Sequence, residues 1–158
     1  MARDALRIDT TRDAPFIPLK ISIGLSLQAA EVAGKAILRA LGQSPDEIRR
    51  QHQKHHLVAL LEDARDRLRR HGGVTWARHG DFLSWKPVFD GVVVDTTIAD
   101  YFDEHFAHGP SAYPRNYFYP DLLTFTGPKP IYAVLVMVDH LIDVAHDVAT
   151  ACASGDES

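Results

Sequence analysis

The sequence predicts an all-α fold, an up-and-down helical bundle of four to five helices with an irregular aromatic insertion. Three segments repeat apolar residues at helical spacing, and the clearest of them covers residues 131–149. The chain has 158 residues, of which 46% are hydrophobic, so it is long enough to bury one core. We therefore expect one domain over residues 16–152, with a flexible arm (1–15) before it and a flexible tail (153–158) after it.

The first helix is expected from about Leu19, because Pro15 and Pro18 punctuate the polar segment before it. Its apolar residues step by four and three and form one stripe: Ile23, Leu27, Ala30, Gly34, Ile37 and Leu41. Gly42 is a suitable stop for this helix.

The second helix is expected to begin at a capping box, in which Ser44 and Glu47 flank a proline at the first helical position. Its later part is amphipathic. The residues on its apolar face are Leu57, Leu60, Leu61, Ala64 and Leu68. Gly72 and Gly73 should end this helix.

The middle of the chain, Val74–Thr97, contains apolar and aromatic residues without a clean period, and it stays unassigned. Within it, Val92–Val94 fits either a short strand or a buried extended loop. A short helix is expected next, because Ile98, Phe102 and Phe106 are four residues apart.

An aromatic loop, Tyr113–Asp121, precedes the last helix. That helix should follow Pro130. Its wide apolar stripe comprises Ile131, Val134, Leu135, Val138, Leu141, Ile142, Ala145, Val148 and Ala149.

Composition and charge exclude several protein classes. Cys152 is the only cysteine, the first twelve residues are rich in charge, and the longest apolar run stops after eight residues, short of the roughly 20 that span a bilayer. We therefore expect a cytoplasmic protein without a membrane span. The net charge of -4 argues against wholesale nonspecific binding to nucleic acid.

The charges are nevertheless unevenly distributed. Residues 49–71 contain seven Lys or Arg residues against three acids, whereas no Lys or Arg follows Lys129. The basic segment could bind an anionic ligand, and the alternative is that both regions are solvated helix faces.

Strong catalytic motifs are missing from the sequence. It has no Gly-rich phosphate loop, no nucleophile elbow and no cysteine cluster, so no cofactor is predicted. One alternative is a metal site on the last helix, where a carboxylate-x-x-His spacing occurs. Its ligands would be Asp139, Asp143, His146 and Asp147. A solvated polar face explains the same pattern and is favoured, since these residues lie opposite the apolar stripe.

Two segments resemble hallmarks of the HEPN family. Residues 29–38, AAEVAGKAIL, are similar to the family's "AEKALKALL" helix, and residues 54–61, KHHLVALL, are similar to its "HDLVxLL" helix. His56 stands where the family commonly has Asp. Residues 118–121, FYPD, resemble the family's "RYPD" loop, with Phe118 in place of the arginine.

The resemblance implies a helical bundle, often a homodimer, that binds nucleotides or RNA or accompanies a minimal nucleotidyltransferase, as in toxin-antitoxin systems. A homodimer is also predicted from the number of exposed-type aromatic residues, although they would equally cap the bundle of a monomer. These residues are Trp76, Trp85, Tyr113, Tyr117, Phe118 and Tyr119.

Two classes of function therefore stay open. The favoured one is a noncatalytic module, with a ligand site where a basic helix faces the aromatic loop. Its candidate residues are Arg50, Lys54, His55, Tyr113, Arg115 and Tyr119. The alternative is a hydrolase, either metal-dependent or a ribonuclease of the same family. Family ribonucleases have a histidine four to six residues after an arginine, and Arg65 with His71 fits this spacing best because the polar Asp66 follows the arginine.

Overall fold

The computed structural model describes residues 16–52, 56–89, 91–106 and 132–155, and within these ranges the protein is mostly helical. Three long helices dominate: α2 (Phe16–Ala40), α4 (Leu57–His71) and α8 (Tyr132–Ser154). The all-α class is thus confirmed. No helix among the described residues combines the length and apolar character needed to cross a membrane.

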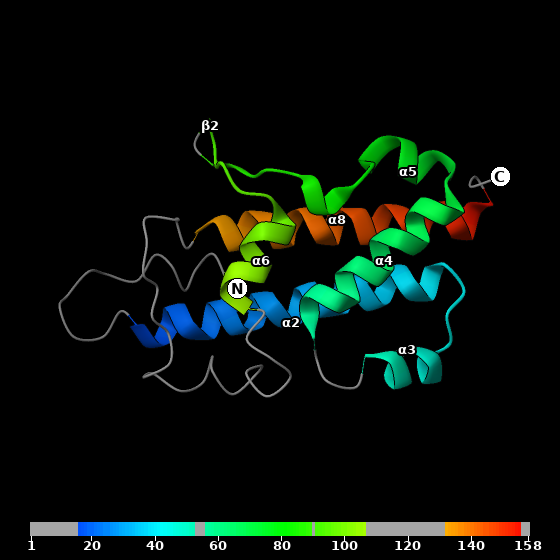
Figure 1. The fold of residues 1–158 in the computed structure, drawn as a ribbon, viewed down its shortest axis with the longest axis horizontal. Helices are drawn as coiled ribbons and strands as arrows, with labels where there is room; N and C mark the ends of the chain where they lie inside the picture. Colours follow the sequence, from blue (N-terminus) through cyan, green and yellow to red (C-terminus); the bar gives the residue numbers. More distant parts are fainter. Residues whose placement is uncertain (1–15, 53–55, 90, 107–131, 156–158) are drawn as a thin grey trace.

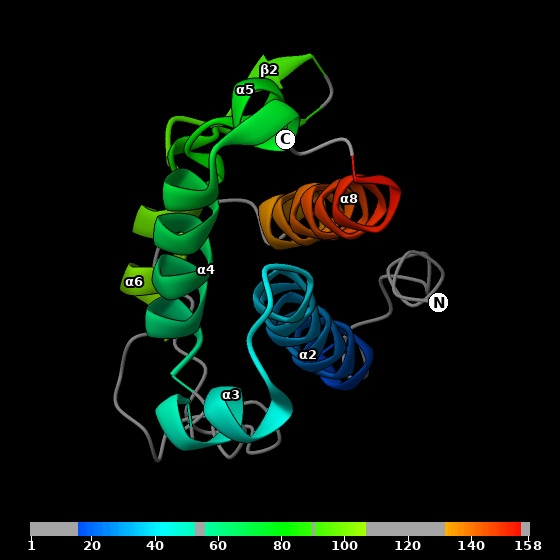
Figure 2. The same ribbon diagram turned by 90° about the vertical axis from the view of Figure 1, so that its right-hand side faces the viewer.

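Helices α2 and α8 make the most extensive contact between described elements. They lie side by side and run in the same direction, while α4 packs on α2 and crosses it obliquely (Figures 1 and 2). The three long helices therefore do not alternate in direction along the chain, as consecutive helices of a simple up-and-down bundle would.

The core lies where these helices meet and where α6 (Ile98–Phe106) packs on α4. Among its largest fully buried side chains are Leu27, Ile37, Leu38, Leu60, Leu61, Leu68, Ile98, Tyr101, Phe102 and Met137. The short helix predicted around Phe102 is confirmed, as is the apolar face predicted for α4.

The predicted second helix is wrong in one respect, because it is two helices. The capping box begins α3 (Pro45–Gln51), in which Ser44 Oγ accepts from Glu47 N at 3.2 Å and Glu47 Oε2 accepts from Ser44 N at 2.7 Å. The chain then leaves helical geometry at His52 and resumes it at Leu57, where α4 starts. Only the later part of the predicted helix is the long amphipathic one.

The unassigned middle of the chain contains three short elements. They are α5 (Gly73–His79), a 3-10 turn η1 (Phe82–Ser84), and an antiparallel hairpin of β1 (Val88–Phe89) and β2 (Val92–Val93). The strand interpretation of Val92–Val94 is thus confirmed in part, since two of the three residues pair with β1. The strand is not buried: 67% of Val92 is exposed.

The apolar stripe predicted for the last helix is confirmed in part, because Val134, Val138, Leu141, Ala145 and Val148 are buried. Ile142 and Ala149 were expected in the core but are exposed, whereas Ala133, Met137 and Val144 are fully buried. The helix also continues to Ser154, two residues beyond the predicted domain end. The predicted arm (1–15), the aromatic loop and residues 156–158 of the predicted tail lie outside the described residues.

Candidate functional site

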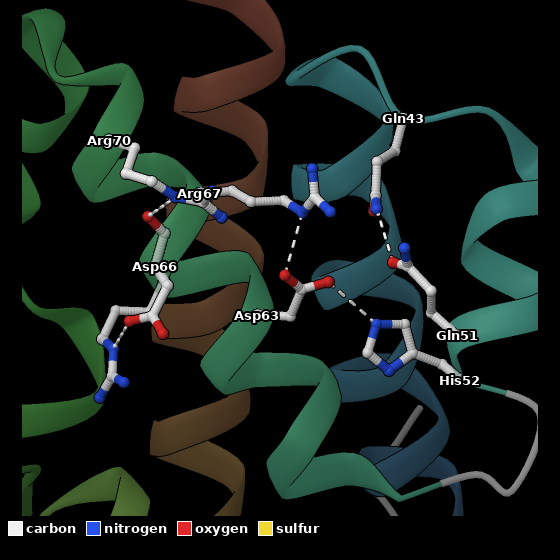
Figure 3. A network of polar contacts seen from close by, with 8 residues as sticks. Gln43, Gln51, His52, Asp63, Asp66, Arg67 and Arg70 are labelled. Atoms are coloured by element: carbon white, nitrogen blue, oxygen red, sulfur yellow. Dashed lines mark hydrogen bonds and ion pairs between the residues drawn. The ribbon is translucent and has the colours of Figure 1, made fainter.

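Two side chains of the basic segment meet one carboxylate, that of Asp63 on α4. His52 Nε2 lies 3.1 Å from Asp63 Oδ2, and Arg67 Nε donates to Asp63 Oδ1 at 2.9 Å (Figure 3). Both carboxylate oxygens are thus occupied. Only 9% of the His52 side chain is exposed. The contact with Asp63 therefore fixes the C-terminal end of α3 against α4.

A second group of contacts joins the end of α2 to α3. Gln43 Nε2 donates to Gln51 Oε1 at 2.7 Å (Figure 3). Arg39 Nη1 donates to the Gln43 carbonyl at 3.1 Å. Gln43 is buried, and its Oε1 has no hydrogen-bond partner among the described residues. Together with the Asp63 contacts, these bonds hold α3 against the bundle, although Ile48 is its only buried residue.

The solvent face of α3 and α4 carries most of the arginines of this segment. Arg50 Nε donates to the Asp46 carbonyl at 3.3 Å, and Arg70 Nε donates to the Asp66 carbonyl at 3.2 Å. Both bonds use Nε, so they leave the terminal amino groups of each guanidinium for another acceptor. Arg49 and Arg69 are also exposed. We call these four residues the arginine face.

Arg65 differs from the arginine face because its charge is already paired. Its Nε donates to Asp66 Oδ1 at 2.9 Å, and 26% of the side chain is exposed. Partial burial alone would lower the pKa of Arg65, but the hydrogen bond and the charge of Asp66 outweigh it and raise the pKa. The guanidinium therefore stays charged and bound to its neighbour.

The structure describes only one residue of the predicted ligand site. Arg50 is exposed on α3, whereas Lys54, His55, Tyr113, Arg115 and Tyr119 lie outside the described residues. The predicted meeting of basic helix and aromatic loop therefore stays a prediction.

The alternative catalytic pair, Arg65 and His71, lies on one helix. His71 is exposed at the last position of α4. Residues six apart on an α-helix point about 120° apart around the axis and lie about 9 Å apart along it. The two side chains therefore leave the helix in different directions.

The alternative metal ligands are also on one helix, α8. Asp139, Asp143 and His146 are exposed and Asp147 is half-buried. No group of three or more His, Cys, Asp or Glu side chains within the described ranges is arranged to hold a metal ion. The Asp147 carboxylate accepts a hydrogen bond from Arg78 of α5.

Sequence reasoning missed a polar cluster between α5 and α8. Asp147 Oδ2 accepts from Arg78 Nη1 at 2.9 Å and lies 2.8 Å from His79 Nε2. The hydrogen bond to His79, followed by the one to Arg78, lowers the pKa of Asp147. No periodic pattern in Val74–Thr97 could have placed Arg78 and His79 against a residue almost 70 positions later in the chain.

The same cluster includes a stacked histidine. The rings of Trp85 and His140 lie 4.1 Å apart, with 11° between their planes, and His79 meets His140 edge-on at 6.0 Å. Burial, followed by the charge of His79, lowers the pKa of His140, while Asp143 opposes the shift. Trp85 and Trp76, which were counted as exposed aromatics, are half-buried against the core.

Comparison with known proteins gives no relative: no family model matches the chain, and no curated protein or solved structure matches it. The HEPN resemblance therefore rests on the sequence motifs alone.

Proposed function

We propose that the chain is a noncatalytic, HEPN-like binding module of the cytoplasm whose ligand is a nucleotide or RNA. The phosphates of this ligand would contact the arginine face. The observation that carries the proposal is the exposure of Arg49 and Arg50 on α3 and of Arg69 and Arg70 on α4, two helices joined by the His52–Asp63 contact, with terminal guanidinium donors of Arg50 and Arg70 left for an acceptor. Guanidinium groups bind phosphate oxygens through charge-assisted, often bidentate hydrogen bonds.

Two ion pairs support this proposal because they keep the other two arginines of residues 49–71 occupied. Arg67 is held by Asp63, and Arg65 is held by Asp66. A ligand phosphate would therefore meet the arginine face first. The buried His52 contact also holds α3 next to α4, so that arginines of both helices belong to one folded unit.

The arginines at the end of α4 also have a structural role that does not involve a ligand. Arg69, Arg70 and His71 occupy the last turn of α4, where cations stabilise the helix dipole by about 0.3–1 kcal/mol each. If that were their whole role, their removal would lower the free energy of unfolding without changing any binding.

The noncatalytic part of the proposal is supported by the geometry of α4. A general acid or base must lie within hydrogen-bond reach of the proton that it transfers. Arg65 is paired with Asp66, and His71 leaves the helix in another direction. Incubation of the purified protein with RNA should thus give no cleavage. Cleavage that His71→Ala abolishes would instead support the ribonuclease alternative.

Binding should be tested by fluorescence anisotropy with a labelled single-stranded RNA and with labelled ATP. The test variant is the double substitution Arg69→Ala/Arg70→Ala. Lys35→Ala/Lys86→Ala is the control of equal charge, since each of these lysines is paired elsewhere, with Glu31 and Asp95 respectively. We expect the test variant to bind RNA more weakly and the control to bind as the wild type does.

The salt dependence of RNA binding gives a second readout. Each phosphate contact to a single strand contributes about 0.7 to the slope of log K against log salt. Loss of two contacts should therefore reduce that slope by about 1.4. Equal affinity and slope in the wild type, the test variant and the control would contradict the proposal.

Two partner proposals follow from the HEPN resemblance: a second copy of the chain and a minimal nucleotidyltransferase, as in toxin-antitoxin systems. Exposed apolar side chains on α2 and α8, namely Leu25, Val32 and Ile142, support the homodimer. Light scattering should give about twice the 17.6 kDa of one chain. Co-expression with the product of a neighbouring nucleotidyltransferase gene, where one exists, tests the second partner.

A further inference from the structure

The contact between α5 and α8 depends on two histidines, and we call it the α5–α8 contact. It consists of the hydrogen bonds of Asp147 with Arg78 and His79 and of the stack of Trp85 on His140. Both links attach the segment 73–85 to α8. The second link includes the imidazole of His140, and imidazole is the side chain type whose ordinary pKa lies nearest physiological pH.

His140 has an unusual environment for such a ring. Its Nε2 is buried and has no hydrogen-bond partner among the described residues. A neutral imidazole carries a hydrogen on one nitrogen only, whereas an imidazolium carries one on both. Whichever neutral tautomer is present, protonation places a charged N–H group at a buried position without an acceptor, which is unfavourable.

The neighbouring charges add to this cost. The charged or titratable groups of α5 in this cluster are Arg78 and His79, and both are held by Asp147. On α8, Asp143 favours protonation of His140, but burial and the charge of His79 outweigh it. In the loop that carries Trp85, the Lys86 ammonium is bound to Asp95.

We propose that the α5–α8 contact is a pH-sensitive device, which is closed while His140 is neutral and opens when His140 takes up a proton. Opening would release α5 and the Trp85 ring from α8 and expose the face of α8 that carries His140, while Phe82 and Leu83 keep η1 in the core. Asp147 would then lose its two partners on α5 and become available to solvent.

The direction of the pH effect follows from linkage. In the closed state the pKa of His140 lies below its ordinary value of 6.5. The closed state therefore binds fewer protons than the open state does at the same pH. The contact is therefore at full strength above pH 6.5 and weakens as the pH falls from 6.5 through the pKa of the closed state. Each unit between the two pKa values changes the ratio of closed to open molecules tenfold.

One force acts in the opposite direction. A cation above the face of an indole is attracted to the ring, so the stack on Trp85 favours the imidazolium. If this attraction prevailed, the pKa of His140 would lie above 6.5 and acid would tighten the contact. The sign of the pKa shift therefore decides the proposal.

The first test is an NMR titration of the wild-type protein that follows the His140 ring protons. We expect its midpoint below pH 6.5, and we expect the midpoint to rise in His79→Gln, which removes the side chain whose charge lowers the pKa of His140. A midpoint at or above 6.5 in the wild type would overturn the proposal. This measurement needs no variant for its main result.

The second test follows the movement itself. In Trp76→Phe the remaining tryptophan is Trp85, whose emission should shift to longer wavelength between pH 7.5 and 5 while the far-UV circular dichroism stays helical. The shift should disappear when His140→Phe is added, because a phenyl ring can stack but cannot take up a proton. His146→Phe, an exposed histidine of the same helix, is the matched control and should keep the shift. Two results would refute the device. One is an emission shift of the same size in Trp76→Phe/His140→Phe, and the other is the absence of any shift in Trp76→Phe alone.

Discussion

Gly34 of α2 lies directly against Leu61 of α4: a Cβ atom added to Gly34 would be 3.1 Å from Leu61 Cδ2. It would also lie 3.2 Å from Leu60 Cγ. These distances are shorter than ordinary van der Waals contacts, so the two helices approach closely at this point because the side chain of residue 34 is a hydrogen atom.

Gly34→Val should destabilise the protein. The branched side chain would overpack the contact with Leu60 and Leu61, which costs about 1–3 kcal/mol of unfolding free energy. Gly34→Ala should change it by less than about 1 kcal/mol, since the gain in helix propensity offsets the crowding. Urea unfolding measures both, with Gln28→Val at an exposed position of α2 as control. A control loss as large as that of Gly34→Val would show that packing is not the cause.

Asp63→Asn should loosen the corner between α3 and α4. The substitution removes the carboxylate that His52 and Arg67 share, and we expect a loss of about 1 kcal/mol because the contacts are partly buried. The matched control is Asp66→Asn, whose ion pair with Arg65 is exposed and should contribute less than about 0.5 kcal/mol. Chemical denaturation at pH 7 compares the two. Equal losses would contradict the special role of Asp63.

Ser44→Ala should weaken α3 through loss of its capping box. The cost is about 1 kcal/mol, because the hydroxyl accepts from the backbone N–H of Glu47. Ser44→Asp retains a capping acceptor and should remain close to the wild type. Hydrogen exchange of residues 45–51 locates the effect, and slow exchange there in Ser44→Ala would argue against it.

Acid should weaken the pairing of Asp147. Its pKa is lowered below the usual 3.8 by His79 and Arg78, so its contribution to stability is fully present above about pH 3.8 and is lost as the pH falls through the folded-state value. The difference in unfolding free energy between wild type and Asp147→Asn should therefore shrink between pH 5 and pH 2. With Arg78→Gln/His79→Gln as background, the same difference should be nearly independent of pH.

The sequence predicted those parts of the fold that local patterns determine. Ser44 and Glu47 form the expected capping box, and the face from Leu57 to Leu68 is buried as its spacing indicates. Such features depend on residues within one or two turns of each other, so they can be recognised without knowing the fold.

The misjudged parts depend on contacts between distant residues. The helix breaks at His52, whose ring is held by Asp63 eleven positions later. In α8, apolar residues occur on more than one side, so the packing against α2, and not the spacing, decides that Met137 is buried and Ile142 is not. The polar clusters were missed for the same reason, because His79 and Asp147 are brought together only by the tertiary fold.

The pairing of α2 with α8 determines when the protein can fold during its synthesis. Helix α2 ends at Ala40, but its main partner begins at Tyr132 (Figure 1). Helix α4 can pack on one side of α2 earlier, but the side of α2 that α8 covers stays exposed while the ribosome adds the residues up to Tyr132. Such exposed surface invites aggregation or capture by chaperones, and contacts between distant segments slow folding. A ribosome stalled before Tyr132 would hold a chain that cannot complete its core.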